Sequence, residues 1–247
     1  MIRAALVHSQ NPSRPLVEAQ AVFDTFAARG LPTTPFPLKR LTRRQLPLAP
    51  DVLVAGDTQS VPMALRQLGI EGPFLPTYPS ALRPWMGRRI RLSTVANVRR
   101  SSLTQPQFVK PAARTKRFTG FVLREPSDEM YFAGASGQTE VWLADVVDFT
   151  VEHRVYVIDG RVRGVCGYAG RGPTPPSAFL ENLVAALVAA GEPTAGIAVD
   201  VGMVEDRWVV VECNEGFGLG LYPGFDAATY TDLLLARWRS LTATLRG

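Results

Sequence analysis

Three polar side chains interrupt apolar runs near the end of the sequence and could together bind a cation. They are Asp200, Glu212 and Asn214. Alternate residues of a strand share a face, so Glu212 and Asn214 would project together. Two carboxylates and an amide offer the oxygen ligands that Mg²⁺ takes, and Mg²⁺ commonly binds together with phosphate. The alternative is an ordinary strand pair with unusual polar positions.

The elements that must position these side chains are two strands. Residues 196–216 contain two runs rich in Val and Ile on either side of Glu205 and Asp206, a pattern that predicts a β-hairpin. A turn centred on Asp206 puts Asp200 opposite Glu212. A turn centred between the two polar residues would make Asp200 face away, and the first ligand would be lost.

Two lysines earlier in the chain could bind phosphate. Lys110 lies near the end of the short apolar run Phe108-Val109-Lys110-Pro111, and Lys116 follows in a loop that ends at Gly120. A lysine at such a turn can serve as a point charge on a nucleotide phosphate, and glycine allows close backbone approach. Ordinary surface lysines are the alternative.

A second hairpin is predicted around Asp159-Gly160, a strong two-residue turn signal that pairs Ile158 with Arg161. Alternation then separates a polar face from an apolar face. The polar face holds Glu152, Arg154, Tyr156, Arg161 and Arg163, and the apolar face holds Val155, Val157, Val162, Gly164 and Cys166. Arg154 either forms a structural ion pair with Glu152 or acts as a fork for phosphate or carboxylate.

The remaining pattern predicts an α/β protein in two parts. Two strand–helix units are expected: a strand at 2–7 followed by a helix at 16–28, and a strand at 51–55 followed by a helix at 60–68. Prolines crowd the stretch 72–85, which indicates an extended linker. We therefore expect an N-terminal domain over 1–100 and a second domain over 101–247. Further helices are expected at 177–190 and 227–245.

Composition and charge exclude some classes of protein. The chain has 46% hydrophobic and 20% charged residues and no apolar run of roughly 18 residues, so we expect a cytoplasmic globular protein without a membrane span. Its two cysteines lack the spacing of a zinc site, and two histidines are too few for a His-based cage. Residues 1–105 hold 14 basic and 5 acidic side chains, against 13 and 17 in the rest. The basic half could contact nucleic acid, an anionic substrate or an acidic partner, or be a solvated face.

The order of these residues resembles the ATP-grasp family of carboxylate–amine ligases. The shared pattern is two lysines, an apolar strand, Glu152-x-Arg154, Asp200, and Glu212-x-Asn214. Within that family it is most similar to the compact bacterial and phage clade named for an Arg-to-Lys exchange. The resemblance implies an ATP-grasp fold made of an N-terminal Rossmann-like α/β domain, a lid-like lobe and a C-terminal lobe. The lobes would cover about residues 101–143 and 144–247.

The resemblance also implies roles for individual residues. Lys110 and Lys116 would hold ATP phosphates, with Lys116 and Arg154 at the reacting phosphoryl group. Asp200, Glu212 and Asn214 would ligate Mg²⁺, with two ions expected. The strand 141–147 would contact adenine through its backbone. Further cofactor contacts would come from Val141, Ala144, Asp145, Val147 and Glu152. The chain departs from the family in a phosphate-covering loop with few glycines and in having Ala144-Asp145 where a Gln-Glu pair is frequent.

An ATP-dependent amide ligase is the implied activity. A substrate carboxylate would attack the γ-phosphate to give an acylphosphate, and an amine would then displace phosphate. Arg154, Arg163, Tyr168 and the loop 215–222 would form the carboxylate pocket. The expected partners are small-molecule or peptide carboxylates and amines, with a homodimer also allowed and nucleic acid less favoured. Two alternatives stay open: a nucleotide-binding protein without ligase activity, acting in regulation or nucleic-acid handling, and a phosphotransferase that stops at phosphorylation.

Overall fold

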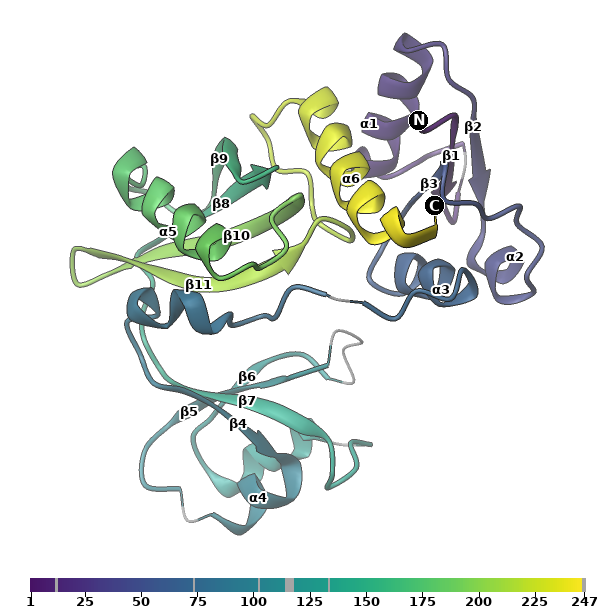
Figure 1. Ribbon diagram of the computed structural model, residues 1–247. Helices are drawn as coiled ribbons and strands as arrows, with labels where there is room; N and C mark the ends of the chain where they lie inside the picture. The colour runs from purple at the N-terminus through teal and green to yellow at the C-terminus, as the bar shows by residue number, and fades with distance from the viewer. Residues whose placement is uncertain (12, 73, 102, 114–117, 133, 246–247) are drawn as a thin grey trace.

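The computed structural model describes residues 1–247 except 12, 73, 102, 114–117, 133 and 246–247. Its strands form three sheets, and helices pack on each of them (Figure 1). The mixed helix and strand content confirms the expected α/β class. No helix within the described residues is long and apolar enough to cross a membrane.

The N-terminal sheet is parallel, with strand order β2-β1-β3. Its strands are β1 (Ala4–His8), β2 (Thr33–Phe36) and β3 (Val52–Ala55), and its helices are α1 (Val17–Ala28), α2 (Leu38–Thr42) and α3 (Ser60–Gln67). The two predicted strand–helix units correspond to β1 with α1 and to β3 with α3. Strand β2 escaped prediction because it is short and contains Pro35, which is tolerated here at the edge of the sheet.

The middle sheet is antiparallel, with strand order β4-β7-β5-β6. Its elements are β4 (Ile90–Thr94), α4 (Val95–Arg100), β5 (Gln107–Pro111), β6 (Phe121–Leu123), the 3-10 helix η2 (Pro126–Phe132) and β7 (Glu140–Asp145). Val98 of α4 and Phe132 of η2 pack with Val109 and Leu143 of the sheet. Because β4 pairs with β7 along its whole length, a boundary at residue 100 would cut this sheet. Residues 90–94 therefore belong to the same sheet as β5 and β7.

The C-terminal sheet is antiparallel, with strand order β11-β10-β8-β9. Its elements are β8 (Val151–Ile158), β9 (Arg161–Gly170), α5 (Ser177–Ala189), β10 (Gly196–Val204), β11 (Arg207–Glu215), α6 (Ala227–Leu241) and the short η3 (Ala243–Leu245). Leu183 and Leu187 of α5 pack with Val155, and Leu233 of α6 belongs to the core around Tyr156. Helix α6 also belongs to the core of the N-terminal unit, so it joins the two (Figure 1).

The β8–β9 hairpin confirms the predicted turn but corrects the assignment of faces. Ile158 pairs with Arg161 as expected. The register then shifts, so that Tyr156 pairs with Gly164 and Arg163 is the extra residue. Gly164 and Cys166 consequently lie on the face of Tyr156, not on the face of the valines, and Cys166 packs in the same core as Tyr156. This irregularity moves residues 164–167 to the other face. A second register shift, at Tyr168, restores the expected face for Ala169 and Gly170.

Candidate functional site

The hairpin that carries the candidate cation ligands has a different turn from the one expected. Glu205 and Asp206 both have positive φ, at 47° and 61°, and form a two-residue turn. Such a turn alone would make Asp200 face away from Glu212. A register shift next to Asp200 makes Val211 an extra residue on β11 and restores the pairing of Asp200 with Glu212.

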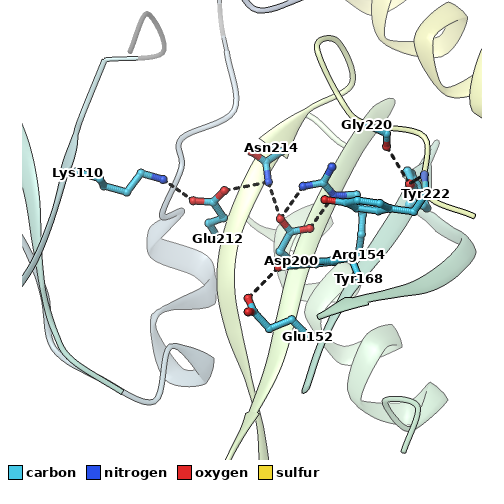
Figure 2. A network of polar contacts seen from close by, with 10 residues as sticks. Lys110, Glu152, Arg154, Tyr168, Asp200, Glu212, Asn214, Gly220 and Tyr222 are labelled. Atoms are coloured by element: carbon cyan, nitrogen blue, oxygen red, sulfur yellow. Dashed lines mark hydrogen bonds and ion pairs between the residues drawn. The ribbon is translucent and has the colours of Figure 1, made fainter. Parts of the chain in front are cut away.

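The candidate ligands meet in one polar network (Figure 2). Arg154 on β8 donates from Nε and Nη2 to the two carboxylate oxygens of Asp200, at 2.8 Å each. Asn214 Nδ2 lies 3.0 Å from Asp200 Oδ2 and 3.3 Å from Glu212 Oε1. The three predicted ligands and Arg154 are therefore brought together by three neighbouring strands.

Lys110 joins this network from the middle sheet. Its ammonium group, projecting from β5, forms an ion pair with Glu212 Oε2 (Figure 2). The two side chains are about 100 positions apart in sequence, so this contact links the middle and C-terminal sheets. Lys116, the second predicted phosphate ligand, lies outside the described residues.

Burial and charge set the ionisation of the central pair. Asp200 is only 3% exposed, and burial raises the pKa of its carboxyl group while the hydrogen bonds and charge of Arg154 oppose that rise. Burial is the largest single effect and lowers the pKa of Arg154, but the hydrogen bonds and the charge of Asp200 together outweigh it, so that the pKa of Arg154 is raised. A bidentate pair of this kind fixes both groups in one geometry.

Two tyrosines cover Arg154 on the side of the loop that follows β11. The Arg154 guanidinium lies 4.9 Å from the ring centroid of Tyr222 and 5.9 Å from that of Tyr168, and the two rings are stacked with centroids 5.1 Å apart. Tyr168 donates its hydroxyl to Glu152 at 2.9 Å. Burial and the charges of Asp200 and Glu152 raise the pKa of Tyr168, so it stays a neutral donor.

A cavity of about 380 Å³ opens beside this network. Lys110, Arg154, Glu212 and Asn214 line it. The remaining walls come from β5 and the residues between β5 and β6, from β11 and the loop after it, from the turn after β3 and from the linker before β4. Those walls are Thr58, Thr77, Phe108, Pro111, Ala113, Phe118, Gly120, Cys213, Glu215, Phe217, Gly218 and Leu219. Its volume is in the range of small-molecule sites.

The predicted hinge residues lie elsewhere. Val141 is buried within β7, and Ala144 and Asp145 end that strand, where Asp145 is paired with Arg89 at 3.0 Å. Val147 follows in the connection to β8. None of these four lines the 380 Å³ cavity. Arg163, proposed for the carboxylate pocket, is exposed on β9 and also does not line it.

Several residues of the site were not singled out by their chemistry in the sequence. Tyr222 and the wall residues Phe217 and Leu219 lie in the glycine-containing loop after β11, which was expected as a whole, over 215–222, to contribute to the carboxylate pocket without a separate role for any of the three. Arg88 was counted only among the basic residues of 1–105, but it donates to the backbone carbonyls of Val210 and Val211 at 2.9 and 2.8 Å.

The side chains present fit a hard divalent cation. Asp200, Glu212 and Asn214 supply only oxygen and amide groups, which suit Mg²⁺ better than a soft metal. Each carboxylate is currently balanced by one cation, Arg154 or Lys110. Within the described part of the chain no three His, Cys, Asp or Glu side chains form a metal-binding group, so the third protein ligand would have to be the amide of Asn214.

Solved structures show the fold to which this arrangement belongs. A RimK domain ATP-grasp protein from Sphaerobacter thermophilus superposes with a TM-score of 0.64, at 17% identity over 94% of this chain and 99% of that one. D-alanine–D-alanine ligase from Bacillus anthracis gives a TM-score of 0.58, at 13% identity over 99% of this chain and 100% of that one. The ATP-grasp ligase PsnB was solved with the precursor peptide PsnA2 and AMPPNP. It gives a TM-score of 0.52, at 16% identity over 96% of this chain and 97% of that one. The fold is therefore ATP-grasp, as expected.

Sequence comparison identifies the family. No curated protein sequence matches the chain. The family description that does match is the ATP-grasp domain of the Arg-to-Lys clade, family 2, over residues 85–233. This region covers more than half of the 247 residues and contains Lys110, Arg154, Asp200, Glu212 and Asn214. The chain therefore belongs to the second family of the Arg-to-Lys clade of ATP-grasp domains.

Proposed function

We propose that this protein is an ATP- and Mg²⁺-dependent ligase that joins a carboxylate to an amine through an acylphosphate. One observation carries the proposal: Lys110, Arg154, Glu212 and Asn214 line a single cavity between two sheets, and the buried Asp200 contacts Arg154 and Asn214 behind it. Cationic groups and oxygen ligands in one site are what phosphoryl transfer needs, because catalysis there rests on positioning and charge neutralisation.

The ion pair of Lys110 with Glu212 can be replaced by contacts to bound ligands. Lys110 can release Glu212 and take a phosphate oxygen, and Glu212 is then free to ligate a cation. Arg154 stays fixed by Asp200 and by the stacked tyrosines, so it can present a stable positive charge to the transferring phosphoryl group and the substrate carboxylate. Mg²⁺ would neutralise further charge on that group.

The remaining assignments rest on the resemblance and the relatives. Lys116 is proposed to hold phosphate with Lys110, and the backbone of residues 141–147 is proposed to contact adenine, with Glu152 supporting the nucleotide site through Tyr168. PsnB has been solved with a precursor variant, Mg and ADP, and the Bacillus anthracis ligase with ATP. These structures support the choice of ATP and Mg²⁺ for this chain.

The test is release of ADP from ATP with a panel of carboxylates and amines. Glu212→Gln should lower Mg²⁺-dependent ADP formation at least about 100-fold, because it removes one anionic cation ligand without changing side-chain size. Glu205→Gln is the matched control, since Glu205 lies in the exposed turn of the same hairpin. Unaltered turnover in Glu212→Gln would remove the metal assignment.

Hydroxylamine separates the proposed ligase from its alternatives. An acylphosphate is trapped as a hydroxamate, which should form with wild type and ATP. A stable phosphorylated product in the absence of any amine would instead identify a phosphotransferase. Nucleotide binding without ADP release from any pair would identify a binding protein.

A further inference from the structure

A second, smaller cavity of about 220 Å³ lies at one edge of the N-terminal sheet. It is bounded by the carboxyl ends of β1 and β3, the first turns of α1, one side of α6 and the loop after β11. Its apolar wall includes Val7, Leu16, Ala19, Leu219, Tyr230 and Leu234. The resemblance assigns only the loop 215–222 of this cavity, to the carboxylate pocket, and its walls from β1, β3, α1 and α6 have no assigned role.

The position of the cavity is where a parallel sheet binds ligands. Strands β2 and β3 pair with opposite edges of β1, so the strand order reverses between β1 and β3. In open α/β sheets, ligands bind in the crevice outside the carboxyl ends of the strands at such a reversal. Val7 and His8 end β1, Ala55 ends β3, and all three line the cavity.

The size and polarity of the cavity select an apolar group. An apolar cavity of roughly 150 Å³ accommodates benzene, so about 220 Å³ has room for the side chain of leucine or phenylalanine. Leu16 lines the mouth although it is 77% exposed. None of the described residues that line the cavity is a lysine or arginine, and the basic side chain of His8 already faces Asp57 at 3.4 Å, so an anionic side chain would find no free cation among them.

The two carboxylates of the cavity already have structural partners. Asp57 Oδ1 accepts hydrogen bonds from the backbone of Ser60 at 2.7 Å and Gln59 at 3.1 Å, which begins α3. Glu18 Oε1 accepts one from the backbone of Leu221 at 3.1 Å. These contacts hold both carboxylates in place, where they repel an anion and leave the apolar wall to make the contacts.

The smaller cavity adjoins the 380 Å³ cavity. Gly218 and Leu219 line both. This shared wall is held from the side of the N-terminal unit and α6: the backbone of Gly218 donates to Gly56 at 3.1 Å, and the Tyr230 hydroxyl donates to the carbonyl of Leu219 at 2.8 Å. A molecule reacting beside Arg154 could thus extend a side chain over this loop into the smaller cavity.

We propose that the cavity at the β1–β3 edge binds the apolar side chain of one of the two substrates, of the size of leucine or phenylalanine. That the bound side chain belongs to a substrate rests on the proposed ligase function. That the cavity binds an apolar group does not. The side chain belongs either to the carboxylate or to the amine, and the two sources are distinguished by substrates that offer only one reacting group.

Two variants block the cavity, and a neighbour provides the control. Leu16→Asp puts a charge at the mouth without disturbing the fold, because Leu16 is the exposed N-cap residue of α1 and Asp is a preferred N-cap. Ala19→Phe fills the interior. Val17→Asp is the matched control: it adds the same charge one residue on, in the same helical turn, at a 58% exposed position that does not line the cavity.

The first measurement needs no turnover. Binding of 4-fluorotoluene, followed by ¹⁹F NMR, should be present in wild type and Val17→Asp and at least about tenfold weaker in Leu16→Asp and Ala19→Phe. Equal binding to all four proteins would overturn the proposal, whatever the enzyme activity proves to be.

The second measurement tests the substrate class. With hydroxylamine as amine, N-acetyl-leucine should release ADP faster than N-acetylglycine if the carboxylate supplies the side chain; with acetate as acid, leucinamide should exceed glycinamide if the amine does. Leu16→Asp and Ala19→Phe should abolish that preference, and Val17→Asp should keep it. ADP release without any apolar preference overturns this proposal alone. Absence of ADP release from every pair, with probe binding intact, overturns the proposed ligase function and leaves the cavity assignment supported.

Discussion

Asp200 and Glu212 face each other across β10 and β11 because β11 has one extra residue, Val211, between the turn and this pair. The two-residue turn at Glu205 and Asp206 sets a register in which Asp200 would face away, and the bulge at Val211 reverses that. The pairing of the two carboxylates therefore depends on an irregularity in the ladder. β-Bulges are frequent next to functional sites because they re-aim side chains.

Arg88 holds this bulge, and removing it should disturb the site from a distance. Its guanidinium donates to the carbonyls of Met86, Val210 and Val211. Arg88→Met leaves these carbonyls without that donor, so we expect a loss of about 1–3 kcal/mol in the free energy of unfolding. Mg²⁺-dependent ADP formation should fall as well, because Glu212 directly follows the bulge. Urea denaturation and the ADP assay measure the two effects.

The control for this prediction is the next residue. Arg89→Met removes an exposed guanidinium whose partner is Asp145, and a solvent-exposed pair of this kind contributes little to stability. A loss of stability as large in Arg89→Met as in Arg88→Met would contradict the role given to Arg88.

Local signals predicted the parts of the site that depend on local chemistry. Asp159-Gly160 specified its turn, and the pairing of Ile158 with Arg161 followed. The side chains of Asp200 and Glu212 were recognised because carboxylates are rare in apolar strands. Their pairing was predicted from a turn centred on Asp206, which does not occur. The two-residue turn shifts the register by one residue, and the bulge at Val211 shifts it back.

Other features depend on tertiary contacts that short-range patterns do not encode. The extra residue Arg163 on β9 placed Cys166 beside Tyr156 rather than with the valines, and nothing in the local alternation marks it. The assignment of β4 to the middle sheet needed its pairing with β7, which comes some 50 residues later. The ion pair of Lys110 with Glu212 also joins distant segments.

The pair Arg154–Asp200 should show a large coupling between its two members. Arg154→Met leaves the buried carboxylate of Asp200 without its guanidinium and should cost about 3–5 kcal/mol of unfolding free energy. The double change Arg154→Met with Asp200→Leu removes both charges and should recover most of that loss. Urea denaturation of the single and double variants gives the coupling. Additive losses in the double variant would contradict a direct interaction.

The hairpin turns offer a test of backbone strain that leaves the cavity untouched. Asp206 has a φ of 61° without being glycine, whereas Gly160 has a φ of 70°. The left-handed region costs an L-residue about 1–2 kcal/mol, and glycine costs about 0.5–1 kcal/mol in chain entropy. Asp206→Gly should therefore stabilise by up to about 1 kcal/mol. Gly160→Ala should destabilise by about 1–2 kcal/mol. Loss of stability in Asp206→Gly by urea denaturation would contradict the turn geometry.

The two cysteines should be unreactive in the folded protein. Burial raises the pKa of the Cys213 thiol well above its ordinary value and raises that of Cys166. A raised pKa lowers the fraction of thiolate, the reactive form, at any pH below it. Alkylation by iodoacetamide at about pH 8 should thus be at least about tenfold slower in the native protein than in urea, for both residues. Mass spectrometry distinguishes the two sites, and native labelling of Cys213 at the unfolded rate would contradict its burial.

Glu215 connects the candidate cation ligands to the framework of the protein. It directly follows Asn214, and it accepts hydrogen bonds from Arg237 of α6 and from the backbone of Leu75 in the linker. The side chains of Arg237 and Glu215 form an ion pair and are each 2% exposed. Breaking such a buried pair should cost about 3–5 kcal/mol, so Arg237→Met should be strongly destabilised in urea.

The surface pair Arg207–Glu205, 3.9 Å apart and at the turn of the same hairpin, is the matched comparison. Arg207→Met should change the unfolding free energy by less than about 1 kcal/mol. Arg237→Lys keeps the charge but loses the bidentate geometry, so its stability should lie between those of wild type and Arg237→Met. Since Glu215 follows a candidate cation ligand, Arg237→Lys should also raise the Mg²⁺ concentration needed for half-maximal ADP formation, whereas Arg207→Met should not. An unchanged Mg²⁺ dependence in Arg237→Lys would mean that the pair stabilises the fold without positioning Asn214.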